Sequence, residues 1–297
     1  MSLMDSYVDR DVVKHFASLI EDAATTPIKI VVFGDDLWKI INDYNLTSQL
    51  PDNVTLEQGL GTVRKTIEKI FIDRIIAFSR NENSIVAIKE QFLTMAGTQS
   101  SLKDELERGA DIRVVDNILG AMEVAHKKRR NSILFPITGY EDEALITAAG
   151  LAKSKTVGFR NFFVLNGHYR LSGIVNELAA TSTRVSGFII PFKVGLITGT
   201  SAFSKIPLVN KKSVVISGYE PMEIMQSISM VVTQQTEGSF AALFQRTKDV
   251  SDEIITRSQW MIEEVFDPSP LSLPKLGILP NSGFKIKEKY KDFDVEK

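Results

Sequence analysis

Short runs of β-branched and aromatic residues alternate with longer segments of helical apolar spacing along most of this chain. Turn residues bound the short runs, which predicts strands at 28–33, 74–78, 84–88, 112–115, 132–137, 162–165, 188–191 and 213–217. The helical spacing is clearest at 115–128, 141–152 and 221–235. Continuous apolar strands that alternate with helices are typical of parallel sheets covered on both faces. We therefore predict an α/β fold of two tandem Rossmann-like domains, with parallel sheets flanked by helices.

Two breaks in this pattern suggest the domain boundaries. A basic run at 127–130 ends one predicted helix just before a strand, and its cations are also what the C-terminus of a helix favours. Three prolines between Asp267 and Pro274 exclude a helix there, so the last long helix should end near Phe266. We predict a first domain over 1–130, a second over 131–266, and an extended C-terminal strap over 267–297 that packs back on the body.

Charge and length narrow the possible partners. The 297 residues carry 35 basic and 37 acidic side chains, a formal net charge of −2, so no overall field attracts nucleic acid or an anionic membrane. No apolar run approaches the roughly 20 residues of a spanning helix, and no export signal begins the chain. We expect a cytoplasmic protein that binds neither nucleic acid nor membrane.

The chain contains no cysteine. Disulfides, thiolate nucleophiles and cysteine-ligated iron-sulfur clusters all require the sulfur atom, so the sequence excludes each of them. Only His15, His126 and His168 remain as imidazole ligands, and a structural zinc site is not expected. We expect no cofactor and no bound metal.

Several glycine-containing segments occur in a distinctive order: Leu50-Pro-Asp-Asn-Val with Gly59-Leu-Gly61, Arg108-Gly-Ala-Asp-Ile-Arg-Val-Val115, Thr138-Gly-Tyr-Glu141, Gly187-Phe-Ile-Ile-Pro191, Ser217-Gly-Tyr-Glu-Pro221 and Gly277-Ile-Leu-Pro-Asn-Ser-Gly283. Together they resemble the HypD family, the scaffold on which the iron-cyanide-carbonyl unit of nickel-iron hydrogenases is assembled. The resemblance covers 27–294. It implies two α/β domains, which in the family precede a cysteine-rich module with an iron-sulfur cluster.

The chain departs from the family at the residues that carry its chemistry. Gly34 stands where the family's first loop has a cysteine, and Thr62 and Lys65 stand at the two sulfurs of its next loop. The family's Pro-Gly-His-Val appears as Pro191-Phe-Lys-Val194, so Lys193 replaces a histidine. The hydroxyl of Thr62 cannot exchange with a disulfide, and the ammonium of Lys65 repels a metal cation. Neither of these two residues therefore preserves the chemistry of the cysteine that it replaces.

Asp35 and Asp36 follow a predicted strand and precede a predicted helix. They are candidates for an acid/base pair or for magnesium ligands. The alternative is that one of them caps the helix, which is the commoner role of aspartate at this position.

Glu141 and Glu220 each follow a Gly-Tyr turn that resembles the family's Gly-Phe-Glu. Strand ends are where open α/β sheets bind ligands, so the two carboxylates are candidates for facing each other across one crevice, with one raised pKa. The alternative is that each lies at a helix start and accepts backbone N–H bonds. His168, also at a strand end, is a candidate because histidine titrates near neutrality, although a lone histidine is more often a polar surface or cap residue.

Two classes of function remain open. The resemblance favours a HypD-like protein without redox or iron-sulfur chemistry, a binding or scaffold module related to hydrogenase or other metallocentre maturation. Its implied partner is a small chaperone of the HypC type or a metalloenzyme subunit. The alternative is an enzyme of another class, or a small-ligand sensor, that uses the interdomain cleft. Its candidate groups would be Asp35, Asp36, Glu141, His168, Lys193 and Glu220.

Overall fold

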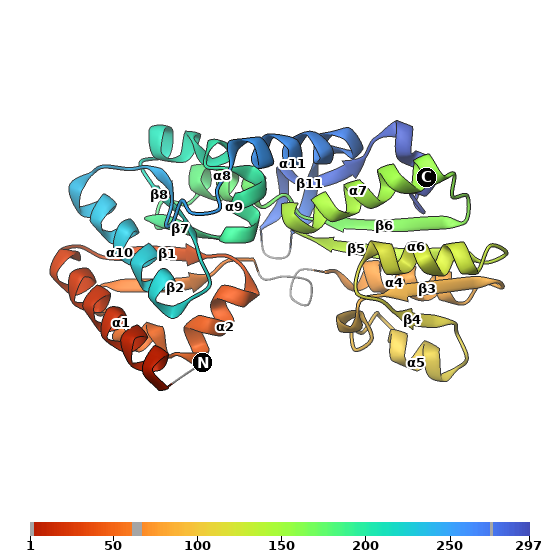
Figure 1. The fold of residues 1–297 in the computed structure, drawn as a ribbon, viewed down its shortest axis with the longest axis horizontal. Coiled ribbons are helices and arrows are strands. Elements are labelled where there is room, and N and C mark those ends of the chain that lie inside the picture. Colours follow the sequence, from red (N-terminus) through yellow and green to blue (C-terminus); the bar gives the residue numbers. More distant parts are fainter. Residues whose placement is uncertain (1–2, 61–66, 274–275) are drawn as a thin grey trace. The chain divides into compact units, whose positions relative to one another are not determined.

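The computed structural model describes residues 3–60, 67–273 and 276–297, which form two compact units (Figure 1). The first unit consists of Met1–Thr62 and Ser172–Thr256, and the second of Val63–Leu171 and Arg257–Lys297. Each unit contains one parallel sheet, as the sequence predicts. The units are interleaved along the chain, however, and the boundary expected at 130 and 131 does not separate them. It falls within one sheet, because strands on either side of it pair.

The first unit has a five-stranded parallel sheet in the order β2-β1-β7-β8-β9. Its strands are β1 (Ile28–Val32), β2 (Val54–Gln58), β7 (Gly187–Pro191), β8 (Ser213–Ser217) and β9 (Ala242–Phe244). Its helices are α1 (Leu3–Ala23), α2 (Asp35–Asp43), α8 (Leu171–Thr181), α9 (Phe192–Thr198) and α10 (Pro221–Glu237), with short turns η1 (Leu46–Gln49), η3 (Ser201–Phe203) and η4 (Ile206–Asn210).

Both faces of the central strands of this sheet are buried. Helices α1, α2 and α10 share one apolar cluster with Ile189 of β7 and Val215 of β8. The neighbouring residue Ile216 points to the other face, where it lies against Gly195 of α9, and a Cβ on Gly195 would be 2.3 Å from it. Because successive side chains alternate between the two covered faces, β8 is buried along its whole length and its three central residues are apolar.

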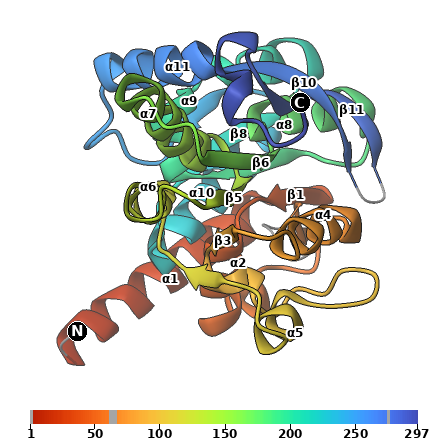
Figure 2. The ribbon, with the colours of Figure 1, turned by 90° about the vertical axis from the view of Figure 1, so that its right-hand side faces the viewer.

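The second unit has a four-stranded parallel sheet in the order β4-β3-β5-β6. Its strands are β3 (Ser84–Ile88), β4 (Ile112–Val114), β5 (Ser132–Gly139) and β6 (Phe162–His168). Its helices are α4 (Lys69–Ser79), α5 (Leu102–Glu107), α6 (Ile118–Lys127), α7 (Glu141–Val157) and most of α11 (Asp252–Val265), with the turn η2 (Glu90–Phe92). Helices α4 and α6 lie on opposite sides of the sheet (Figure 2).

One predicted strand is wrong. Residues 74–78 belong to helix α4, whose buried side chains are Ile72, Ile75, Ile76 and Ser79. Their spacing of three and four residues is helical, and burial on one face of a helix outweighs the strand preference of isoleucine. Strand β2 was not predicted, because only Val54 of its five residues is buried.

The C-terminal residues form a hairpin of β10 (Phe266–Leu273) and β11 (Gly277–Ile286) followed by η5 (Glu288–Phe293). This segment covers the outer edge of β6. The Val295 N–H donates to the Val164 carbonyl at 3.1 Å, and the Asn166 side chain donates to the Phe284 carbonyl at 2.5 Å. Covering an edge strand removes a site for unwanted pairing with other chains. None of the described helices has an apolar stretch long enough to cross a membrane.

A buried carboxylate joins α4 to α5 in the second unit. The side chain of Glu105 is 4% exposed and accepts Arg80 Nη2 at 2.6 Å and Arg108 Nη1 at 2.8 Å. It also accepts the Ser100 hydroxyl at 2.6 Å. The hydrogen bonds from Arg80 lower the pKa of Glu105 to about 2, against the opposing effect of burial.

We predict that Glu105→Gln lowers the free energy of unfolding by about 2 kcal/mol at pH 7, since it removes charge-assisted hydrogen bonds. A depressed carboxyl pKa stabilises the fold above the unfolded-state pKa. The stability that Glu105 contributes should therefore be lost as the pH falls from about 4.5 towards 2. Urea unfolding between pH 7 and pH 3 tests this, and the gap between wild type and variant should narrow in acid. The control Glu107→Gln alters an exposed carboxylate of the same helix and should have no such effect.

Candidate functional site

The carboxyl edge of the first sheet has a topological switch point between β1 and β7. From β1 the chain continues to β2 on one side, whereas β7, β8 and β9 follow on the other. Ligands of open α/β sheets bind where the strand order reverses in this way. The strand-to-helix connections that meet there, called the β1 and β7 loops below, are Gly34 with the first turn of α2, which holds Asp35 and Asp36, and the first turn of α9, which holds Lys193.

An ion pair links the two loops across the switch point. Lys193 Nζ lies 2.9 Å from Asp36 Oδ2, and the side chains are 46% and 64% exposed. The backbone N–H of Lys193 also donates to the hydroxyl of Tyr219, beyond β8, at 3.4 Å. Gln58, at the end of β2, donates to Asp35 Oδ1 at 3.4 Å. Loops from four neighbouring strands are therefore connected along this edge.

Both aspartates lie in the first turn of α2, and the residue that caps the helix is Gly34. The prediction that one aspartate is the N-cap is therefore wrong, because the helix begins at Asp35 and its N-cap is Gly34. Carboxylates in a first turn are still favoured by the positive end of the helix dipole. The exposed Asp36 additionally gains Lys193 as a partner.

The conformation of Gly34 leaves no room for a side chain. Its φ angle is +91°, a region that other residues rarely adopt. A Cβ built on it would lie 2.6 Å from Cγ of Pro191, the last residue of β7. The β1 and β7 loops thus approach each other more closely than any residue with a Cβ would permit.

Three further residues on this edge are not among the candidates from the sequence: Glu223, Arg246 and Phe192. Glu223, with a side chain 8% exposed, accepts the Glu220 backbone N–H at 3.0 Å and lies 3.0 Å from Arg246 Nη1. The guanidinium of Arg246 also stacks over the ring of Phe192, 4.8 Å from its centroid. Arg246 follows β9, a strand of only three residues that is absent from the strands predicted from the sequence.

Four of the six candidate residues therefore lie at one sheet edge: Asp35, Asp36, Lys193 and Glu220. Their arrangement favours paired charges over a metal site. No group of three or more potential metal-ligating side chains occurs in the described parts of the chain. An ammonium 2.9 Å from Asp36 also occupies the place that a cation would take at that carboxylate.

The other two candidates, His168 and Glu141, belong to the second unit. The ring of His168 is 2% exposed, with Nε2 2.9 Å from the Thr147 hydroxyl and Nδ1 3.3 Å from the Gly139 carbonyl. Burial lowers its pKa to about 3, so the imidazole is neutral near pH 7. An enclosed, neutral ring with partners on both nitrogens serves packing and is not available as a general acid.

Glu141 begins helix α7 and is 3% exposed. Its Oε2 accepts the backbone N–H of Leu171 at 3.0 Å, as the alternative reading expects. A lysine–carboxylate pair also spans the switch point of the second sheet, with Lys89 after β3 and Glu143 in α7 2.7 Å apart. Glu220 lies in the other unit, so it remains a prediction that the carboxylates of Glu141 and Glu220 face each other across one crevice.

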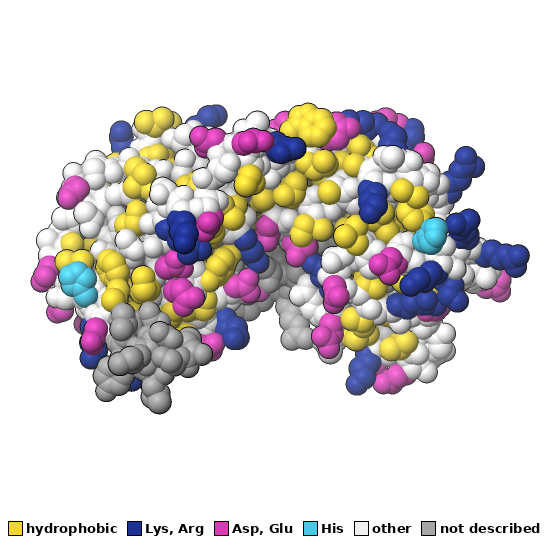
Figure 3. Space-filling model, viewed as in Figure 1, with side chains coloured by type: hydrophobic (Ala, Val, Ile, Leu, Met, Phe, Trp, Pro, Cys, Tyr) yellow, Lys and Arg dark blue, Asp and Glu magenta, His cyan; other side chains and the backbone are white. Residues whose placement is uncertain are grey.

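Of the positions that match family cysteines, Gly34 is described above, whereas Thr62 and Lys65 lie outside the described residues. On the face shown in Figure 3, acidic and basic side chains are interspersed over both units. This distribution agrees with the near balance of 35 basic and 37 acidic residues.

Comparison with known proteins gives consistent matches. A hydrogenase expression and formation protein of Methanocaldococcus jannaschii is 28% identical over 252 residues, 85% of this chain and 70% of the relative. The hydrogenase maturation factor HypD2 of Bradyrhizobium diazoefficiens is 27% identical and matches 100% of this chain and 81% of its own length. HypD of Escherichia coli is 25% identical and matches 94% of this chain and 76% of its own length.

The family model of HypD, described as the hydrogenase formation hypA family, matches residues 11–297. The match spans both parallel sheets and the C-terminal hairpin. It also includes both switch-point loops of the first sheet. This chain therefore belongs to the HypD family.

Proposed function

We propose that this protein is a binding or scaffold module in hydrogenase maturation, or in the assembly of a related metallocentre, that works without thiol or iron-sulfur chemistry. Family membership supports the general role, since the relatives are named as hydrogenase maturation factors. The absence of cysteine supports the second half of the proposal. An iron-sulfur cluster held by cysteine does not fit this donor set.

The observation that carries the proposal is the close contact between Gly34 and Pro191. The family resemblance puts a cysteine at position 34, but here the φ angle and the 2.6 Å approach exclude any Cβ. The resemblance puts a histidine at position 193, and here the lysine pairs with Asp36. The two loops that carry a cysteine and a histidine in the family here contact each other through Gly34 and Lys193. Such loops favour a rigid binding surface over a reactive site.

The proposed partner is a small chaperone of the HypC type or a metalloenzyme subunit. The exposed Lys193–Asp36 pair gives the carboxyl edge of the first sheet a polar, charged surface on loops that are tied together. Preorganised loops favour binding, because less conformational entropy is lost when a partner docks.

A second candidate function is ligand sensing or catalysis at the same edge. It is favoured by the presence of Asp35, Asp36, Lys193 and Glu220 on loops of one sheet. Such a role would use the charged groups themselves, whereas a scaffold uses them to dock a partner. The absence of a co-purifying protein would favour this candidate, and a thermal-shift screen of metals, nucleotides and small metabolites would then identify the ligand.

We predict that Gly34→Cys costs about 1–3 kcal/mol in backbone strain and an additional amount from the contact with Pro191. The matched control is Gly158→Cys, because Gly158 also has a positive φ angle of +78° but no atom within 4 Å of its would-be Cβ. Thermal or urea unfolding should show a clearly larger loss at position 34. Equal losses at the two positions would show that a cysteine fits the loop, and the argument from Gly34 would fail.

Protein purified without oxygen from native cells should contain no stoichiometric iron and no acid-labile sulfide. The physical reason is that all 297 positions lack the sulfur ligand such clusters use. Metal analysis and the visible absorption spectrum of the same preparation measure this. A brown protein with iron and sulfide in fixed ratio would overturn the proposal.

Affinity purification from native cells should recover a small HypC-like chaperone or a metalloenzyme subunit, identified by mass spectrometry. Lys193→Glu should reduce that recovery several-fold, because it replaces the ion pair with two repelling carboxylates at the exposed edge. The control Lys205→Glu makes the same charge change in the segment just before η4. Recovery that is unchanged in Lys193→Glu would exclude this edge as the docking surface.

A further inference from the structure

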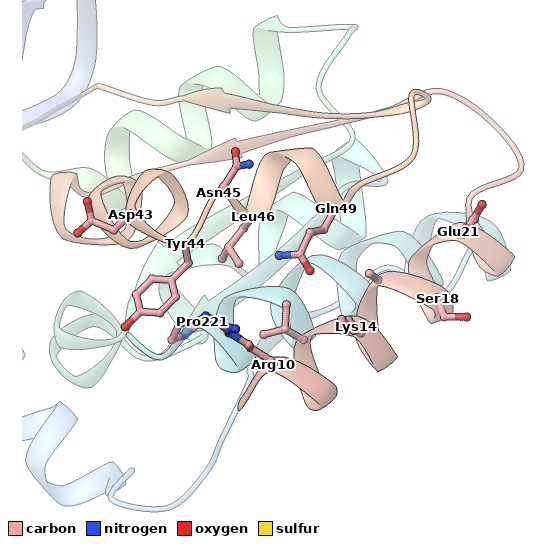
Figure 4. Close-up of a pocket in the computed structure, with 12 residues that line it drawn as sticks. Arg10, Lys14, Ser18, Glu21, Asp43, Tyr44, Asn45, Leu46, Gln49 and Pro221 are labelled. Atoms are coloured by element: carbon pink, nitrogen blue, oxygen red, sulfur yellow. The ribbon is translucent and has the colours of Figure 1, made fainter. Parts of the chain in front are cut away.

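A groove of about 820 Å³ lies in the first unit, between α1 and the segment that joins α2 to β2. Its volume falls within the range of small-molecule sites in proteins, roughly 300–1,000 Å³. One wall is a face of α1 and the other is residues 43–49, with Pro221 at the start of α10 closing one end (Figure 4). The groove is independent of the proposed docking edge, because none of the four candidate residues there lines it.

The floor of the groove is apolar and belongs to the main core of the unit. Val13 is 5% exposed and Leu46 is 1% exposed, and Ala17 packs against the same cluster. The wall that holds Leu46 is fixed by a turn in which Asn45 has a φ angle of +48° and its carbonyl accepts the Ser48 hydroxyl at 2.8 Å. Both walls of the groove are therefore anchored to the core of the unit, α1 through Val13 and the connecting segment through Leu46.

Positive charge gathers towards one end of the groove. Arg10 and Lys14 lie one turn apart on the same face of α1. Neither forms an ion pair with a carboxylate in the part of the chain from residue 10 onward whose side chains the structure describes. On the opposite wall, Asp43 is paired with Lys39 at 3.3 Å. The remaining carboxylate of the lining, Glu21, lies at the other end of the groove (Figure 4).

Hydrogen-bonding groups face these cations. Figure 4 shows Tyr44 beside Arg10 and Pro221, with the side chains of Leu46 and Gln49 pointing into the space between the walls. The phenol is half exposed. An apolar floor, a cationic end and a few polar groups are the usual composition of a site for an amphipathic small molecule.

We propose that this groove binds an organic anion of small-molecule size, with a carboxylate, phosphate or sulfonate group on an apolar body. The anionic group meets Arg10 and Lys14, and the apolar body lies on Val13, Ala17 and Leu46. Guanidinium and ammonium groups form charge-assisted hydrogen bonds with such anions, and these are stronger than neutral ones. The apolar floor adds affinity that inorganic anions cannot gain.

The probe for the test is the fluorescent anion 8-anilinonaphthalene-1-sulfonate, compared with the neutral N-phenyl-1-naphthylamine. The full-length protein should bind the sulfonate more tightly. Arg10→Gln combined with Lys14→Gln should weaken sulfonate binding roughly tenfold and leave binding of the neutral dye nearly unchanged. Ser18→Trp, which fills the groove from the exposed α1 wall, should weaken binding of both dyes.

The control variant combines Lys205→Gln with Lys211→Gln, beside the exposed apolar pair Leu208 and Val209, each 72% exposed. It removes two cations next to a rival apolar surface and should leave sulfonate binding unchanged. Near-ultraviolet circular dichroism confirms that each variant stays folded. The proposal fails if the neutral dye binds as tightly as the anion, if the α1 double variant binds like wild type, or if the control variant loses affinity equally.

Discussion

Burial of both faces of the central strands of each parallel sheet is the constraint on which the rest of this structure depends. Strands such as β3 and β8 are buried along their whole length, so neither face of these strands is free for chemistry or binding. Near the central strands, the exposed polar side chains lie at the strand ends and on the outer helices. The Lys193–Asp36 pair lies at such a strand end, and the groove beside α1 lies on an outer helix.

Both sheets have the same feature at the point where their strand order reverses. In the first, a lysine after β7 pairs with a carboxylate after β1, and in the second Lys89 after β3 pairs with Glu143 beyond β5. Each pair joins two loops that strand pairing alone leaves separate at their tips. The exposed Lys193–Asp36 pair contributes little stability, so its value lies in holding the geometry of these connections, whereas Lys89–Glu143 is partly buried.

Much of the fold could be predicted from the sequence, because apolar periodicity reports burial directly. Strands β3 and β8 have the predicted bounds, and α6, α7 and α10 differ from prediction only at their ends. The sequence predicts a strand over part of the helix at 69–79, since its closely spaced isoleucines satisfy both the strand and the helix pattern. Candidate residues at strand ends could be chosen from the sequence, because open α/β sheets bind ligands at the carboxyl ends of their strands whatever the order of the strands. Arg246 and the close approach at Gly34 could not be, since they depend on which strands become neighbours.

The pairing of β1 with β7 has a consequence for synthesis on the ribosome. The Lys29 N–H donates to the Ser186 hydroxyl across a separation of 157 residues, and β1 has only β2 as a partner until that segment emerges. The second sheet, by contrast, is made from one uninterrupted stretch that ends with β6 at His168. During translation all strands of the second sheet are synthesised before β7. Until then β1 has one unpaired edge. For that interval the unpaired edge of β1 exposes the nascent chain to misassembly.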